Sequence, residues 1–299
     1  DTQSATIVAE LGIFNIIIPA NAKYIRLTVP DDLKSSFFFM LNQSLNPIDN
    51  NCITVKKIGG DFNSLVKAKN YADSLGYTTT IRVGEGIWAE ELNFTTGLPH
   101  RMIGESRNAT IFTNLPSSRF EIIKVKGGWY FENIKFLNGG RGYAVHADYA
   151  GAGAVEFFNC TLESYEHSAI GSGSHQDQHL ILNNCNILNT GAYIGAPPLY
   201  WHNNVNNGVT NQKLIVINCN ITTNNEQGIR IDDANKLNGG SGNEAEVIFI
   251  NTSVYSRDFG VGNNNCDFRP YTTPAAGKLV GDSIALSQRS FGNNVPKLN

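Results

Sequence analysis

The stretch Leu180-Ile-Leu-Asn-Asn-Cys-Asn-Ile187 decides the fold, because the chain repeats it with variations. The other copies are residues 129–136, 155–162, 214–221 and 247–254. Aligned on one shared asparagine, the copies place Asn133, Asn159, Asn184, Asn218 and Asn251 at steps of 26, 25, 34 and 33 residues. A near-regular period of this size is typical of a solenoid.

Each copy consists of a short apolar, β-branched strand, a polar asparagine and a second short strand with alternating polarity. Apolar residues at three- and four-residue spacing, which a helical solenoid needs, are missing. We therefore predict a right-handed parallel β-helix in which the repeat asparagines stack into a hydrogen-bonded ladder. The next column would hold Ile134, Cys160, Cys185, Cys219 and Thr252, with buried thiols rather than disulfides or metal ligands, because the chain has no Cys-x-x-Cys spacing.

Composition narrows the class of partner. The chain has 299 residues and a net charge of −3, without the basic stripe that binding to a phosphate backbone requires. We therefore expect no nucleic-acid binding. The chain also has no apolar run of 18 residues, so we expect no membrane insertion. The start at Asp1, without a signal-peptide pattern, suggests a processed product or a fragment.

Three regions are predicted along the chain. Residues 1–50 read as a small β segment, a partial sandwich or cap, that is too short to bury much core alone. Residues 51–266 form the β-helix, opened by an amphipathic helix at about 61–75 with Asp61 as its N-cap and Gly76 just past its end. Beyond 267 the repeat fades, and residues 267–299 are interpreted as a C-terminal cap or tail.

The opening of the repeat region resembles a known superfamily. Three segments are similar to the start of pectin-lyase-like β-helix proteins, pectin methylesterases in particular. They are Gly59-Gly-Asp-Phe-Asn-Ser-Leu-Val-Lys-Ala68, which is followed by a strand, then Gly86-Ile-Trp-Ala-Glu-Glu-Leu92, and then residues 102–111. The resemblance covers about residues 55–264. It implies that the helix closes the N-terminal end of the solenoid.

The catalytic pattern of methylesterases does not carry over. Where that family has a Gln-Asp pair and a later Asp, this chain has Glu166-His167 and roughly Ala192-Tyr193, and its own Gln176-Asp177 comes about ten residues too late. Pectin methylesterase activity is therefore not expected. The polygalacturonase pattern is also out of order, because Gly173-Ser-His175 precedes Asp232-Asp233.

Strand parity predicts a polar strip on the later repeats. If Leu199, Trp201, Ile229 and Ile231 face inward, then Tyr200, His202, Arg230 and Asp232 face outward, with His202 one strand spacing, about 4.8 Å, from Asp232. An aromatic ring beside a histidine, an arginine and a carboxylate can stack on a sugar, bind its hydroxyl or anionic groups and move a proton. The catalytic candidates are His202, Arg230 and Asp232, and Tyr200 is a substrate-binding candidate; a surface patch of paired polar residues is the competing interpretation.

Two further predictions concern neighbouring residues. The loop Ser172–His179 contains His175, Gln176, Asp177 and His179, which we take as substrate-binding candidates rather than metal ligands, because the segment reads as a turn into a strand. Asp233 is another substrate-binding candidate and is aligned in one column with Asp148, three repeats away. On the same alignment His146 would face the core.

Two functional classes remain. The layout of a small β segment, a capping helix and a β-helix resembles bacteriophage tailspikes and appendages, which implies a homotrimer on the virion tail that binds, and in some cases depolymerises, bacterial surface polysaccharide. The alternative is a secreted polysaccharide lyase or glycoside hydrolase of the same superfamily. We expect no fixed cofactor; Ca²⁺ belongs only to the lyase alternative, and no outward cluster of several acidic residues supports it.

Overall fold

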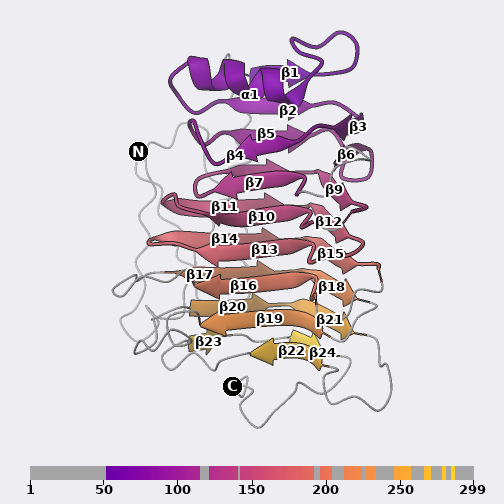
Figure 1. The fold of residues 1–299 in the computed structure, drawn as a ribbon, viewed down its shortest axis with the longest axis vertical. Coiled ribbons are helices and arrows are strands. Elements are labelled where there is room, and N and C mark those ends of the chain that lie inside the picture. The colour runs from indigo at the N-terminus through magenta and orange to yellow at the C-terminus, as the bar shows by residue number, and fades with distance from the viewer. Residues whose placement is uncertain are drawn as a thin grey trace, which may run out of the picture. The chain divides into compact units, whose positions relative to one another are not determined.

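Three parallel β-sheets wind into a solenoid. The computed structural model describes residues 52–114, 121–140, 142–191, 196–203, 212–223, 227–233, 246–256, 266–270, 278–280 and 284–286. Each turn of the solenoid adds one strand to each sheet, so the strands stack from the end that carries α1 to the end that carries β24 (Figure 1). The predicted right-handed parallel β-helix is confirmed.

The three sheets are named A, B and C in the order in which each turn visits them. Sheet A comprises β1 (Cys52–Val55), β2 (Thr80–Val83), β5 (Arg101–Gly104), β8 (Tyr130–Glu132), β11 (Gly153–Phe158), β14 (Gln178–Asn183), β17 (Lys213–Ile217), β20 (Glu246–Ile250) and β23 (Lys278–Val280). Sheet B comprises β3 (Gly86–Ala89), β6 (Thr110–Thr113), β9 (Lys135–Asn138), β12 (Thr161–Ser164), β15 (Asn186–Asn189), β18 (Asn220–Thr223), β21 (Thr252–Ser256) and β24 (Ile284–Leu286). Sheet C comprises β4 (Leu92–Phe94), β7 (Ile123–Lys126), β10 (Val145–Tyr149), β13 (Ile170–Ser174), β16 (Leu199–Asn203), β19 (Gln227–Asp233) and β22 (Cys266–Pro270).

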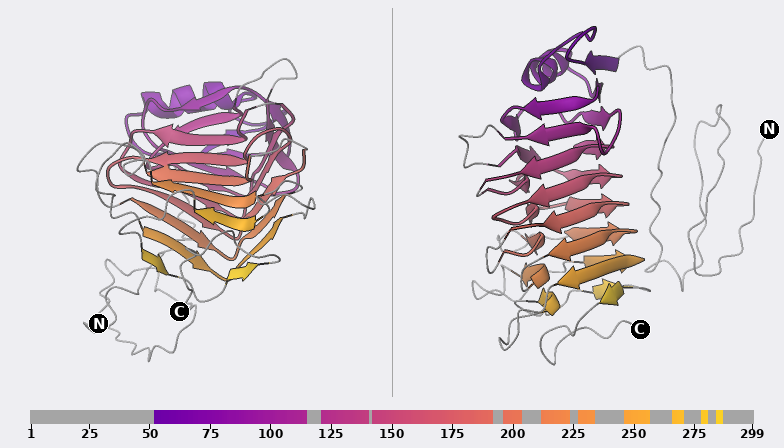
Figure 2. Two further views of the ribbon diagram at one scale, coloured as in Figure 1. Left: turned by 60° about the horizontal axis from the view of Figure 1, so that its bottom comes forward. Right: turned by 90° about the vertical axis from the view of Figure 1, so that its right-hand side faces the viewer.

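The core lies inside the ring of sheets, and Figure 2 shows the stacked turns from two further directions. Inward side chains stack on their own kind: Phe131 and Phe157 lie 5.0 Å apart between ring centroids and nearly parallel. The thiols of Cys160, Cys185 and Cys219 are buried and unbonded to other sulfurs, as predicted, and the Cys185 amide donates to Cys219 Sγ at 3.4 Å. Burial raises the pKa of the Cys160 and Cys219 thiols, which keeps them in the neutral form that a core accommodates.

The repeat asparagines make the corner between sheets A and B. All five adopt the left-handed conformation, with φ between 45° and 57°, which asparagine tolerates better than most other residues. Their amides also form the predicted ladder: Asn159 donates to Asn133 at 2.6 Å, Asn184 to Asn159 at 3.1 Å and Asn251 to Asn218 at 2.8 Å. One residue type thus satisfies both the backbone turn and the stack.

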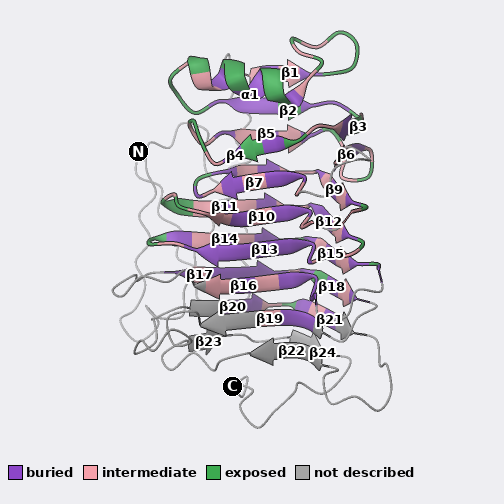
Figure 3. Cartoon of the chain, viewed as in Figure 1, coloured by how far each residue is buried: buried purple, intermediate pink, exposed green. Residues whose placement is uncertain are grey.

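The capping helix closes the N-terminal end, and it starts later than predicted. Helix α1 spans Leu65–Ser74 with Ser64, not Asp61, as its N-cap. Asp61 instead accepts hydrogen bonds from the amide and hydroxyl of Thr54, while Glu90 accepts the amides of Leu65 and Val66 at the start of the helix. The outer face of α1 is largely exposed (Figure 3), and within the described ranges no helix is long and apolar enough to cross a membrane.

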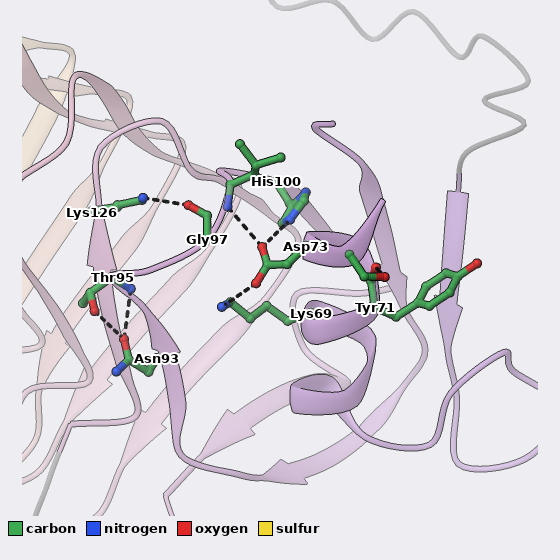
Figure 4. Close-up of polar contacts among 10 residues, drawn as sticks. Lys69, Tyr71, Asp73, Asn93, Thr95, Gly97, His100 and Lys126 are labelled. Carbon is green, nitrogen blue, oxygen red and sulfur yellow. Dashed lines mark hydrogen bonds and ion pairs between the residues drawn. The ribbon is translucent and has the colours of Figure 1, made fainter. Parts of the chain in front are cut away.

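A charged cluster fixes the far end of the helix to the first turns. Asp73 Oδ2 pairs with Lys69 Nζ at 2.8 Å, and Asp73 Oδ1 lies 3.0 Å from Nε2 of the fully buried His100 (Figure 4). Nδ1 of His100 accepts the amide of Thr79 at 3.1 Å, which leaves Nε2 as the protonated nitrogen of a neutral ring. Lys69 is buried, and it pairs with Asp73 against the solenoid end.

The pKa values of Asp73 and His100 are both lowered. Burial opposes ionisation of Asp73, but hydrogen bonds from Lys69 and His100 outweigh burial and lower the pKa of the carboxyl. Burial lowers the pKa of His100, although Asp73 acts in the opposite direction. Each group therefore stabilises the fold above its unfolded pKa and loses that contribution as the pH falls, His100 below about 6.5 and then Asp73 below about 3.8.

The described strands extend beyond the predicted repeat. β23 pairs with β20 in sheet A and β24 pairs with β21 in sheet B, so the solenoid continues past residue 266, where we expected the repeat to end. The prediction of a small β segment at residues 1–50 lies outside the described residues and stays a prediction.

The corner asparagines stabilise the fold through their ladder hydrogen bonds and through their tolerance of the left-handed conformation, and two substitutions separate these contributions. Asn159→Ala removes two ladder hydrogen bonds and leaves a side chain with Cβ in the left-handed conformation, so we expect about 2–4 kcal/mol less stability. Asn159→Gly loses the same hydrogen bonds but relieves the backbone, and should be more stable than the alanine variant by about 1 kcal/mol. Urea unfolding measures both, and equal losses would show that the backbone conformation carries no cost.

Removing the charge of Asp73 from the cluster at the end of the helix should lower the stability of the protein. Asp73→Asn removes the charge that pairs with Lys69 and His100, and should lower the free energy of unfolding by about 1–3 kcal/mol at pH 7. The control is Glu105→Gln, whose partner Lys56 is 3.6 Å away in an exposed pair; it should change stability by less than about 0.5 kcal/mol. Wild type should also lose stability as the pH falls from 7 to 5 because of His100, and a flat profile there would contradict the assignment.

Candidate functional site

The outward face of sheet C carries the predicted polar strip. Leu199, Trp201 and Ile229 are buried in the core, so the prediction that they face inward is confirmed. Tyr200, His202 and Arg230 face outward and are partly exposed. The backbone register pairs Tyr200 with Arg230 and His202 with Asp232, also as predicted.

The alignment of the two preceding strands was wrong by one residue. Val145 pairs with Ile170, and Ile170 pairs with Leu199. The predicted alignment of Asp148 with Asp233 would instead put Ala144 in the column of Leu199. Both alanines are buried in the turns that enter the strands, so two consecutive buried residues hid the parity. The correction moves every side chain of these strands to the opposite face.

Two predictions change with this register. His146 was expected in the core but lies on the outward face, between the buried Val145 and Ala147. Asp148 was placed in one column with Asp233, but the register puts it in the column of Gly173, His202 and Asp232. An aspartate that sequence reasoning had set aside therefore joins the strip.

The carboxylate of Asp148 is surrounded by three imidazoles. His175 Nε2 lies 3.6 Å from Asp148 Oδ1, His202 Nε2 lies 3.6 Å from Oδ2, and His146 Nε2 lies 4.0 Å from Oδ2. All four side chains are between 20% and 27% exposed, so solvent reaches the group without fully hydrating it. We call Asp148, His146, His175 and His202 the histidine–aspartate cluster.

A missing side chain on β13 makes the cluster possible. Asp148 and His202 are separated by two strand spacings, about 9.6 Å, and side chains that far apart in a column normally have another side chain between them. Gly173 fills the intervening position, and a Cβ there would overlap Asp148 Oδ1 and lie 2.6 Å from His202 Cε1. The glycine lets the carboxylate and the imidazole meet above the backbone.

A second glycine on the same strand seats an aromatic ring. A Cβ on Gly171 would overlap the ring of Tyr143, which therefore lies against the backbone of β13. Tyr143 stacks on His146 with 4.8 Å between centroids and meets His167 edge-on at 4.2 Å. The floor of the site is thus backbone and tyrosine rather than a row of flexible side chains.

Glu121 lies against His146. Glu121 Oε1 lies 3.2 Å from His146 Nδ1, while the other ring nitrogen of His146 faces Asp148. The imidazole, aided by Lys124, lowers the pKa of Glu121 to about 2, although burial acts in the opposite direction. Glu121 is therefore ionised at ordinary pH and keeps a negative charge beside the imidazole.

An aromatic and a cation extend the strip beyond the cluster. The guanidinium carbon of Arg230 lies 4.9 Å from the centroid of the Tyr200 ring, and Tyr200 lies 5.4 Å from His202 between centroids. A cation on one part of a ring leaves the remaining aromatic surface for stacking on an apolar sugar face. The strip therefore offers an aromatic surface, a fixed positive charge and imidazoles side by side.

The second candidate segment, Ser172–His179, divides between two sheets. It was expected to be a loop, but β13 continues to Ser174 and β14 begins at Gln178, which leaves a turn of three residues. His175 joins the cluster, Gln176 and Asp177 are exposed in the turn, and His179 lies on β14 in sheet A. The structure thus brings one of these four candidates to Asp148.

The predictions for Asp232 and Asp233 as site residues stay predictions. The side chains of Asp232 and Asp233 lie outside the described part, so only their backbone register is known. Within the described ranges, no group of three or more His, Cys, Asp or Glu is arranged to hold a metal ion.

The sequence analysis missed the histidine–aspartate cluster. The glycines at 171 and 173 were the available signal, because glycine at an outward strand position indicates a close approach by a neighbour.

Comparisons with known proteins give a likeness of fold. Pectin methylesterase PemA from Erwinia chrysanthemi is 12% identical over 82% of this chain and 91% of its own, with a TM-score of 0.46. The Aspergillus niger pectin methylesterase is 16% identical over 79% and 85%, with a TM-score of 0.45, and the carrot enzyme 11% over 79% and 82%, with a TM-score of 0.40. No protein-family model matches the chain, and no curated protein matches its sequence. These solved structures are right-handed parallel β-helix proteins of the pectin-lyase-like superfamily.

Gly173→Ala tests the geometry of the cluster without removing any of its groups. The new methyl group would force Asp148 and His202 apart, so the imidazole resonances of His202 should shift, and stability should fall by about 1–3 kcal/mol. Gly139→Ala is the control, because nothing lies within 4 Å of a Cβ at that position. Unchanged His202 resonances in the Gly173 variant would mean that the two side chains do not meet in solution.

Proposed function

We propose that the outward face of sheet C binds a polysaccharide and cleaves it by proton transfer. The observation that carries the proposal is the Asp148 carboxylate between the imidazoles of His175 and His202, beside the stacked Tyr200 and Arg230. The parallel strands present these groups in a row along the solenoid axis. An extended chain of sugars fits such a row better than a compact ligand does.

Each group has a role suited to this chemistry. Tyr200 stacks on a sugar ring, and Arg230 binds its hydroxyl groups or an anionic substituent. His202 is the proposed base, and Asp148 orients its ring and stabilises the imidazolium that forms when a proton is taken. His175, on the other oxygen of Asp148, is placed to return a proton to the departing sugar oxygen.

The biological setting remains a separate proposal. A phage tail-associated receptor-binding protein, forming a homotrimer on the virion tail and recognising bacterial surface polysaccharide, is the form that we favour on resemblance of layout. A secreted polysaccharide lyase or glycoside hydrolase is the alternative, with Ca²⁺ required in the lyase case. Both forms use the same strip, so the strip is the part to test first.

Incubation with capsular, teichoic and uronate polysaccharides, with and without calcium, tests the function. We expect shortened products from at least one polysaccharide, with rates reduced about 100-fold in His202→Ala and Asp148→Asn, because each variant removes part of the proton-transfer pair. Arg230→Ala and Tyr200→Ala should weaken binding. Size-exclusion chromatography of the products and binding isotherms are the measurements.

The outcomes separate the alternatives. Binding without cleavage, lost in Tyr200→Ala and Arg230→Ala, would leave a receptor-binding module that uses the same strip. Binding or cleavage unaffected by all four variants would remove the strip from the function. Lys135→Gln serves as the control, because Lys135 lies on sheet B and is not a candidate residue.

A further inference from the structure

The outward face of sheet A carries two glutamates on adjacent strands. Glu132 is the last residue of β8, and Glu156 lies in the middle of β11. The residues next to them in the strands, Phe131 beside Glu132 and Val155 and Phe157 beside Glu156, are buried in the core. Both glutamate side chains therefore point away from the core, on a different sheet from the histidine–aspartate cluster.

The register of the two strands sets the distance between the glutamates. Glu156 pairs with Tyr130 and Phe158 pairs with Glu132, so the two glutamates are one strand and two residues apart. A strand spacing of about 4.8 Å and a rise of about 3.3 Å per residue put their backbone positions about 8 Å apart. Two carboxyl groups about 6.5–9.5 Å apart leave room for a water molecule beside a sugar, which is the separation found in glycoside hydrolases that invert the anomeric carbon.

Glu132 is held as a hydrogen-bond acceptor. Oη of Tyr130 donates to Oε2 of Glu132 at 2.8 Å, and Nδ2 of Asn133 donates to Oε1 at 3.5 Å. Burial raises the pKa of the Tyr130 phenol, which keeps the proton on the tyrosine for this hydrogen bond. The guanidinium carbon of Arg101 lies 4.7 Å from the centroid of the Tyr130 ring and packs on it. Glu132 is thus an oriented acceptor, as a general base must be.

Glu156 is in the opposite situation. It is half-buried and forms no hydrogen bond or ion pair with any residue that the structure describes. Arg101, in the same column of sheet A, stacks on the intervening Tyr130 instead of pairing with Glu156. Burial raises the pKa of the Glu156 carboxyl, and the charge of Arg101 only partly offsets this effect. A carboxyl group that holds its proton more strongly than usual is suited to protonating a departing oxygen.

Phe158 provides an apolar surface beside the two glutamates. It faces outward at the end of β11, in register with Glu132, and is partly exposed. An aromatic ring in this position can stack on the apolar face of a sugar. Because an ionised Glu132 repels uronate and sulfate groups, the patch suits a neutral polysaccharide.

We propose that Glu132 and Glu156 form a second catalytic pair, on sheet A, that hydrolyses a glycosidic bond of a neutral polysaccharide. Glu156 gives its proton to the glycosidic oxygen, which leaves with the bonding electron pair as a sugar hydroxyl group. Glu132 takes a proton from a water molecule, and the oxygen of that water forms the new bond to the anomeric carbon from the opposite side. Transfer of one proton from Glu132 to Glu156 through solvent restores the pair, and the anomeric configuration is inverted.

Release of reducing ends from dextran, mannan, β-glucan and galactan tests the proposal. We expect the wild type to cleave at least one of these polysaccharides, and Glu156→Gln and Glu132→Gln each to lower the rate about 100-fold or more, because each variant removes one proton-transfer group. Proton NMR of the fresh products should show the inverted anomer. Glu156→Gln removes a half-buried charge that has no partner, so its Tm should be no lower than that of the wild type, which separates a lost catalytic group from a lost fold.

Two variants serve as controls. Glu163→Gln is the matched control, because Glu163 is an outward glutamate of sheet B that pairs with Lys135 at 2.8 Å; it should keep the full rate. His202→Ala, on sheet C, should also keep the full rate on these neutral polysaccharides. The absence of reducing ends from all four polysaccharides, or a rate that both glutamate variants keep, would overturn the proposal.

The inference goes beyond the proposed function, and the two can fail separately. Cleavage that is lost in His202→Ala and kept in both glutamate variants would support the proposed function and overturn this inference. Cleavage that is lost in the glutamate variants and kept in His202→Ala would support this inference, whatever the strip on sheet C binds.

Discussion

Stacking of identical positions at the strand spacing is the constraint on which the rest of this structure depends. A turn of the solenoid buries nothing by itself, so each side chain must fit the one above and the one below, about 4.8 Å away. Asparagine meets this demand at the corner between sheets A and B, because its amide both donates and accepts and its backbone tolerates a left-handed conformation. Once the corner repeats, the phenylalanines that precede it and the cysteines that follow it fall into inner columns.

The same constraint gives the outward face of sheet C its chemistry. Columns bring together residues that are 25 to 34 positions apart in the chain, so a site can be assembled from single substitutions in successive turns. Gly173 is the example: by omitting a side chain, it lets Asp148 reach His202 across a strand. Gly171 does the same for Tyr143. The arrangement depends on two positions of β13 that carry no side chain.

Periodicity in the sequence was sufficient to predict the fold and the outward position of several candidate residues. The repeat with Asn184 predicted the sheets, the ladder and the buried thiols, and parity in residues 199–203 and 229–231 placed Tyr200, His202 and Arg230 correctly. The prediction failed where two buried residues are adjacent, at Ala144-Val145 and Ala169-Ile170, since parity cannot tell which of the two begins the strand. That single ambiguity concealed Asp148 and turned His146 inward.

The predicted start of the helix was wrong for a different reason. Asp61 and Ser64 are both good N-cap residues, and sequence alone ranks them about equally. The choice was made by tertiary contacts, because Glu90 accepts the amides at the start of α1 and Thr54 engages Asp61. N-cap preference allows more than one starting residue for the helix, and contacts with neighbouring residues decide which one is used.

The arrangement around Asp148 is unusual for a surface that only needs to be soluble. Surface polar residues in a sheet commonly form pairs of opposite charge, as Lys135 and Glu163 do on sheet B at 2.8 Å. Three imidazoles around one carboxylate differ from such a pair, because Asp148 lies within 4.0 Å of all three rings. Glu121 places a second carboxylate beside one of them, and Gly173 gives up packing to admit another. A solenoid could avoid these costs with a single lysine or threonine in each turn, and local departures of this kind are where function is to be expected.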